Sequence, residues 1–148
     1  SPHDHRDPSR EHNAATEPFV TDDQLRQRWR SLVGQPHFAD HELWFVFVED
    51  GKRQMLPLLN RIGLPIRPER GVVELLMTRL SEISIDGPDV SVAFLLTRPG
   101  TDGLSDTDLT WARIFGDAAD RHGVAIHPIH RANKADLVRV PRSLPHAA

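Results

Sequence analysis

The spacing of hydrophobic residues predicts an alternation of strands and helices along the chain. The strongest strand signal is the continuous apolar run 43–48, which is typical of a strand covered on both faces. A second run of this kind covers residues 90–96, and shorter apolar stretches cover residues 124–130 and 137–140. We therefore expect two central strands and two further strands towards the C-terminus.

A hairpin is predicted directly after the first strand. Asp50-Gly51 is a tight-turn signal, and residues 54–59 would form the returning strand. Pro57 cannot donate a backbone hydrogen bond, so this strand should lie at an edge or carry a bulge. An unpaired edge at this strand would allow a dimer, although nothing in the sequence demands one.

Three helices are predicted from apolar positions that recur with helical spacing. The first begins at the Thr21–Gln24 capping box, and Gly34 ends it. The second covers residues 69–83 after Pro68. The third is opened by Ser105, with an acid three residues on, and is ended by Gly123.

The predicted order is helix, hairpin, helix, strand, helix, strand, strand. This order predicts an α/β fold in which a single mixed β-sheet packs with about three helices. The length of 148 residues fits one domain, which we place at residues 19–140. Residues 1–18 contain few groups to bury and are predicted to be a disordered tail, and 141–148 a frayed C-terminal tail.

Composition excludes several kinds of chemistry. The chain contains no Cys, which removes disulfides, thiol nucleophiles and iron–sulfur clusters. Its formal charge of −3 does not suit a protein built mainly to hold nucleic acid. No apolar run approaches the ~18 residues that span a bilayer. We expect a cytoplasmic protein without a cofactor and without a membrane segment.

Five segments between residues 43 and 140 together resemble the JAB/MPN metalloprotease-like domain, and most closely its RadC type. One of them is the helix after Pro68, which looks like the first helix of the family. Residues 43–51 look like the first strand pair of the family, and residues 92–100 like the strand that delivers its His-x-His-Pro metal motif. Residues 105–108 look like the Ser-x-x-Asp that follows, and residues 123–130 like the next strand. The resemblance implies a cytidine-deaminase-like sandwich.

The resemblance breaks at the metal ligands. With Pro99 matched to the proline of the motif, the two histidine positions fall on Leu96 and Arg98, and Asp108 is the one ligand type retained. A catalytic zinc needs about three protein ligands, so one carboxylate does not hold it. Glu49 and Glu74 are the nearest candidates for the family's general base. The resemblance thus implies a metal-free domain in which Asp108 only caps a helix.

These observations lead to a non-catalytic interaction or regulatory module whose partner is another protein. Its expected working surfaces are the loop 97–104 and the segment 63–70. The candidate binding residues on them are Arg98, Asp102, Arg67 and Arg70.

Two enzymatic alternatives stay open. One is a metal-dependent hydrolase with a relocated site of Asp108, His127 and His130, although alternation along a strand would point the two histidines to opposite faces unless Pro128 bends the chain. The other is a nucleophilic site in which Ser105 lies next to His127.

A third class is a small DNA-associated accessory protein. The first half of the chain is rich in arginine, and the helix and the hairpin tip would form a basic patch if they lay together. The residues concerned are Arg26, Arg28, Arg30, Lys52, Arg53, Arg61, Arg67 and Arg70. Phosphate contacts would make binding steeply salt-dependent. A glycine-containing loop at 98–103 also precedes a helix start, which is a natural place for an anion.

Overall fold

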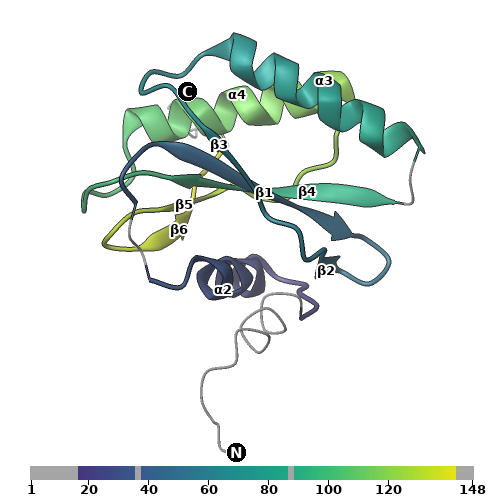
Figure 1. The fold of residues 1–148 in the computed structure, drawn as a ribbon, viewed down its shortest axis with the longest axis horizontal. Helices are drawn as coiled ribbons and strands as arrows, with labels where there is room; N and C mark the ends of the chain where they lie inside the picture. Colours follow the sequence, from purple (N-terminus) through teal and green to yellow (C-terminus); the bar gives the residue numbers. More distant parts are fainter. Residues whose placement is uncertain (1–16, 36–37, 87–88, 143–148) are drawn as a thin grey trace, which may run out of the picture.

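The computed structural model describes residues 17–35, 38–86 and 89–142, and its strands form one mixed sheet (Figure 1). The strand order is β2-β1-β4-β5-β6, and β3 also pairs with β1. In chain order the elements are α2 (Asp22–Val33), β1 (Glu42–Glu49), β2 (Gln54–Met55), β3 (Asn60–Gly63), α3 (Arg70–Asp86), β4 (Val90–Thr97), α4 (Asp106–His122), β5 (His130–Ala132) and β6 (Leu137–Arg139). The predicted α/β class, with a single mixed sheet and three helices, is confirmed.

Most of the two predicted tails lies outside the described residues, which exclude 1–16 and 143–148. Residues 36–37 and 87–88 lie outside them as well. Within the described part of the chain, no helix is both long and apolar enough to cross a membrane.

The centre of the sheet is the antiparallel pair β1 and β4. Their register runs over eight residue pairs, from Glu42 opposite Thr97 to Glu49 opposite Val90. β5 then lies parallel to β4, with Leu95 opposite His130, and β6 returns antiparallel to β5. The two longest apolar runs of the sequence therefore form the two innermost strands.

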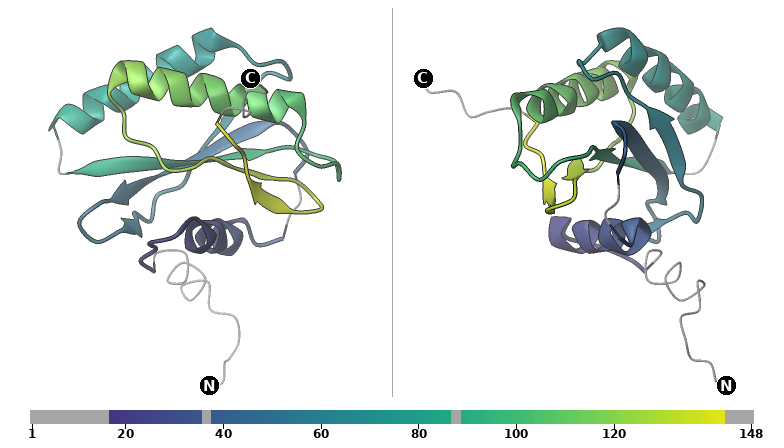
Figure 2. Two further views of the ribbon diagram at one scale, coloured as in Figure 1. Left: turned by 180° about the vertical axis from the view of Figure 1, so that it is seen from behind. Right: turned by 60° about the vertical axis from the view of Figure 1, so that its left-hand side comes forward.

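Helices cover both faces of the sheet. α2 lies on one face and α3 with α4 on the other (Figure 2). Side chains alternate along β1, so that Leu43 and Phe45 join the core under α3 and α4, whereas Trp44 and Val46 join the core over α2. This alternation divides the hydrophobic core into two layers, one on each side of the sheet.

The helix signals of the sequence are confirmed at the residues that carry them. Both predicted capping boxes are present, at Thr21 and at Ser105. Gly34 and Gly123 follow α2 and α4 with φ of 64° and 68°, a conformation that favours glycine. α3 begins one residue later and ends three residues later than the predicted 69–83.

Two predicted strands are wrong in extent, and a proline accounts for each difference. The returning strand 54–59 is shortened to β2, with residues 56–59 around Pro57 outside the ladder, and β3 at residues 60–63 is a strand that was not predicted. The segment 124–130 forms only an isolated bridge between Ile126 and Val92 before β5 begins at His130. His127 still donates its backbone N–H to Val92, but Pro128 has no N–H with which to continue.

Candidate functional site

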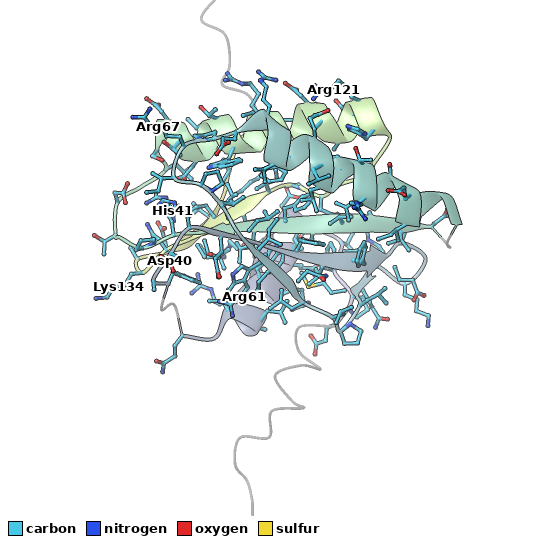
Figure 3. All side chains as sticks on the ribbon, turned by 45° about the horizontal axis from the view of Figure 1, so that its top comes forward. Asp40, His41, Arg61, Arg67, Arg121 and Lys134 are labelled. Atoms are coloured by element: carbon cyan, nitrogen blue, oxygen red, sulfur yellow. The ribbon has the colours of Figure 1, made fainter. Side chains whose placement is uncertain are left out.

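The end of the sheet where β4 finishes carries the residues that the sequence matched to a metal motif. The loop 97–104 and the segment 63–70, the two expected working surfaces, lie at this same end (Figure 1). Asp40, His41, Arg67 and Lys134 are found there too (Figure 3). Sequence segments that are distant along the chain are thus brought together at one end of the molecule.

Asp108 is fixed in the first turn of α4 by the capping box. Its backbone N–H donates to Ser105 Oγ at 3.1 Å, and its Oδ2 accepts the Ser105 N–H at 3.0 Å. Asp108 is 2% exposed, so its carboxylate is shielded from bulk water. The expected capping role of Asp108 is confirmed, although it is not the only interaction of this carboxylate.

Arg98 binds the Asp108 carboxylate through two parallel hydrogen bonds. Its Nε donates to Oδ1 at 2.9 Å and its Nη2 to Oδ2 at 2.8 Å. The remaining donors are used as well, since Nη1 donates to Asp102 Oδ1 at 2.8 Å and Nη2 to the Gly103 carbonyl at 3.0 Å. The fork geometry of guanidinium makes this one of the stronger polar contacts available to a protein.

A second guanidinium lies behind the first. Arg131 of β5 is fully buried, and its Nε is 3.5 Å from Asp108 Oδ2 without a hydrogen-bond partner in the described residues. Its Nη1 donates to Asp136 Oδ1 at 2.5 Å. Asn133 completes the packing by donating from Nδ2 to the Asp102 carbonyl at 2.7 Å. Two arginines and three aspartates therefore form one connected cluster at the end of β4 and β5.

The charges in this cluster stabilise one another. Burial alone would raise the pKa of Asp108, but the hydrogen bonds from Arg98 and from the Ser105 N–H outweigh burial and lower it. The hydrogen bond to Asp108 in turn raises the pKa of Arg98. The hydrogen bond from Arg98 also lowers the pKa of the exposed Asp102. These shifts keep Arg98, Asp102 and Asp108 in their charged forms at neutral pH.

The structure corrects the expectation that Arg98 is a surface binding residue. Its side chain is buried, and each of its three nitrogens donates at least one hydrogen bond within its own chain. Asp102 is exposed, but its carboxylate is held by Arg98. Arg67 and Arg70, by contrast, are exposed and have no ion-pair partner among residues 17–35, 38–86 and 89–142. Of the four predicted binding residues, only these two offer free charge to a ligand.

The alternative metal site is not assembled. Asp108 belongs to α4, on one face of the sheet. The His127 ring instead makes an edge contact with Phe19, which belongs to the core on the α2 face, at 5.2 Å between ring centroids. His130 is buried, and its Nδ1 is 3.2 Å from the Pro128 carbonyl. The described part of the chain contains no group of three His, Cys, Asp or Glu residues that could hold a metal ion.

The two carboxylates considered as a general base are remote from Asp108. Glu49 pairs with Val90, at the opposite end of β4 from Thr97. Glu74 on α3 binds Arg121 and His122 near the end of α4. Neither residue supplies a base to the end of β4.

His127 takes part in a different polar group, which the sequence did not suggest. Ser91 Oγ lies 2.5 Å from Asp50 Oδ1 and 2.7 Å from His127 Nε2. Burial lowers the pKa of His127, and the charge of Asp50 opposes this shift. Ser91 is 4% exposed and stands between the acid and the base rather than beside the base alone. Ser91 is therefore a buried hydroxyl held between two partly exposed side chains and is not an exposed nucleophile. Ser105 is engaged in capping α4 instead of contacting His127.

Comparison with known proteins does not assign this fold and site to a family. No protein-family model, no curated protein and no solved structure matches the chain. The class that the structure itself defines is an α/β domain with a buried arginine–aspartate cluster at the end of its central strands.

Proposed function

We propose that the chain is a metal-free, JAB/MPN-like interaction module that works by binding another protein. The single observation that supports this most is the two-bond contact between Arg98 and Asp108. In the resemblance to the RadC type, Asp108 is the retained ligand and Arg98 stands at a histidine position. A guanidinium here takes the place of the metal ion as the charge that balances the aspartate.

The physical argument concerns the lone pairs of Asp108. A zinc ligand must offer an ionised oxygen to the metal, and both oxygens of this carboxylate already accept hydrogen bonds from a cation. A divalent ion would also have to approach a buried positive charge, which costs free energy in a low-dielectric site. Leu96, at the other histidine position, is buried in the apolar core and supplies no donor atom.

The surface best suited to a partner is the segment before α3. Arg67 and Arg70 are exposed there, and Ile66 beside them is 72% exposed. An apolar side chain flanked by free cations suits a protein surface that carries carboxylates around a hydrophobic residue. The partner we propose for this module is therefore an acidic protein surface.

A basic patch for DNA is less well supported. Several arginines of the expected patch are already bound within the chain, Arg26 to Asp23 and Arg61 to Glu42. Arg28 and Arg53 donate to backbone carbonyls around the start of α2, which places the hairpin tip near that helix but uses its charge locally. Arg30, Arg67 and Arg70 have no ion-pair partner in the described residues, but Arg30 lies on α2, whereas Arg67 and Arg70 lie just before and at the start of α3, which covers the opposite face of the sheet.

The absence of a zinc requirement can be measured directly. Protein purified without chelator should contain well under one zinc per chain, and added zinc should leave its melting temperature unchanged. Asp108→Asn should likewise contain well under one zinc per chain, and added zinc should not change its melting temperature. Stoichiometric zinc that is lost in the His127→Ala/His130→Ala double variant would instead establish the relocated hydrolase site.

The partner surface predicts a charge-reversal effect. Arg67→Glu/Arg70→Glu should remove binding to the partner captured from the native host while leaving the melting temperature within a few degrees of wild type, because neither side chain has a partner in the described chain. Arg30→Glu, an exposed and unpaired arginine on α2, is the matched control and should bind normally. If the captured ligand is nucleic acid, with an affinity that falls steeply with salt, the protein-partner proposal is wrong.

A further inference from the structure

The β3 edge of the sheet is open. Within the described residues β3 pairs with β1 and with no other strand, and the Leu64 N–H donates to the His41 carbonyl at the end of this pairing. In an antiparallel ladder, directly opposed residues alternate between hydrogen-bonded and non-hydrogen-bonded pairs. The residues of this segment that form backbone hydrogen bonds with β1, or with His41 just before it, are therefore Asn60, Ile62 and Leu64. The N–H and C=O groups of the intervening residues, Arg61 and Gly63, then point away from the sheet.

These outward groups are complementary to themselves. If a second copy of β3 lies antiparallel across a two-fold axis through Ile62, Arg61 of each chain stands opposite Gly63 of the other. Both of these pairs are then bonded pairs, which gives four backbone hydrogen bonds. Glycine opposite arginine also leaves room, because a Cβ built on Gly63 meets nothing within 4 Å. The two Ile62 side chains meet at the axis as a β-branched cross-strand pair.

Charge does not protect this edge. Arg61 is the one charged residue of β3, and its Nη2 lies 2.8 Å from Glu42 Oε1 while its guanidinium stacks on Trp44 at 4.7 Å. The opposite edge of the sheet differs, since β6 packs against α2 and its Arg139 binds Asp22 at 2.6 Å. Free strand edges without a charge, bulge or cover tend to pair with another strand.

Exposed apolar side chains flank β3 at both ends. Leu58, two residues before the strand, is 64% exposed, and Ile66, three residues after it, is 72% exposed. Antiparallel pairing of two copies brings the start of one strand next to the end of the other. Each Leu58 would then approach an Ile66 of the second chain, and both would lose contact with water.

We propose that two copies of this chain associate through β3, in antiparallel register about Ile62, to form one continuous sheet. This dimer does not depend on the arginine–aspartate cluster. It shares Ile66 with the proposed partner surface, but its test uses the purified chain alone, so its failure is distinguishable from failure of the proposed function. An interface of one short strand pair is small, so the association should be reversible and visible at protein concentrations on the order of 0.1–1 mM.

Sedimentation equilibrium over that range tests the proposal. Wild type should show a two-state monomer–dimer equilibrium, and Gly63→Pro should weaken the association at least tenfold. Gly63→Pro removes an outward N–H without touching the hydrogen bonds to β1, which is the position where an edge strand tolerates proline. A wild type that stays monomeric, or a folded Gly63→Pro that dimerises like wild type, would overturn the proposal.

A charge design tests the register without changing the backbone. Leu58→Glu/Ile66→Glu places like charges at both contacts and should abolish the dimer, whereas Leu58→Lys/Ile66→Glu places opposite charges there and should retain it. Val20→Glu, at a side chain that is 69% exposed and remote from β3 in sequence, is the control and should dimerise like wild type. Equal behaviour of the two double variants would contradict this register.

Discussion

Arg98→Leu should lower the free energy of unfolding by about 3–5 kcal/mol at pH 7, the cost of breaking a buried ion pair from one side. The variant leaves the Asp108 carboxylate buried and without its two charged hydrogen bonds, because the next cation, Arg131, lies 3.5 Å away and makes no hydrogen bond to it. Chemical denaturation monitored by tryptophan fluorescence gives the change. Arg70→Leu, at an exposed and unpaired arginine, is the matched control and should stay within about 0.5 kcal/mol of wild type.

Two further measurements separate the ion pair from simple packing. The double variant Arg98→Leu/Asp108→Leu should recover much of the loss, because a pair of apolar residues leaves no buried charge. The deficit of Arg98→Leu relative to wild type should shrink as the pH falls towards about 4, since a buried carboxyl without its cation has a raised pKa and is relieved by protonation. A loss below about 1 kcal/mol in Arg98→Leu would show that the contact with Asp108 is not established in solution.

Acid should destabilise the fold through His130. This side chain is 1% exposed, and burial lowers its pKa to about 4, with the hydrogen bond to the Pro128 carbonyl opposing the shift. The folded state therefore resists a proton that the unfolded chain accepts below its ordinary pKa of about 6.5. The contribution to stability is complete above pH 6.5 and is lost progressively as the pH falls to about 4, by about 3 kcal/mol in total.

Nuclear magnetic resonance and denaturation test this together. The His130 ring protons should titrate with a midpoint near 4 while the chain stays folded. His130→Asn keeps a donor for the Pro128 carbonyl without a group that titrates in this range, so its stability should fall less steeply between pH 6.5 and 4. A His130 midpoint near 6.5 in the folded protein would contradict the burial on which this prediction rests.

Much of the fold was readable from local patterns. Both capping boxes lie within four residues of sequence, and the apolar runs of β1 and β4 mark strands with helices on both faces. The predicted strands are wrong where an apolar run contains a proline, at Pro57 and Pro128. Hydrophobicity indicates which residues are buried, but it does not show which of them lack the backbone N–H that a β-ladder needs. Sequence patterns here predict the helices and strands well, but they predict less well which strand residues pair in the sheet.

The site was harder to predict because its members come from distant segments. The sequence predicts Arg98 on a surface loop, and its pairing with Asp108 becomes apparent only when β4 and α4 are in place. No sequence pattern singles out the fully buried Arg131, although its ion-pair partner Asp136 lies only five residues later. The contact of Ser91 with Asp50 and His127 joins segments 41 and 36 residues apart, which no local pattern reveals.

A buried ion pair is not by itself a source of great stability, because desolvation offsets most of its attraction. Its value here is geometric. The cluster ties the loop 97–104 to the start of α4 through Asp102 and Asp108, and to the end of β5 through Arg131. The cluster therefore fixes the positions of this loop, of α4 and of β5 relative to one another.

X-ray diffraction from crystals of chelator-free protein soaked in zinc, with data collected at the zinc absorption edge, tests this central claim most directly. The account predicts no anomalous peak beside Asp108, with the Arg98 guanidinium within about 3 Å of both carboxylate oxygens. An anomalous peak about 2 Å from an Asp108 oxygen, with Arg98 turned away, would contradict it.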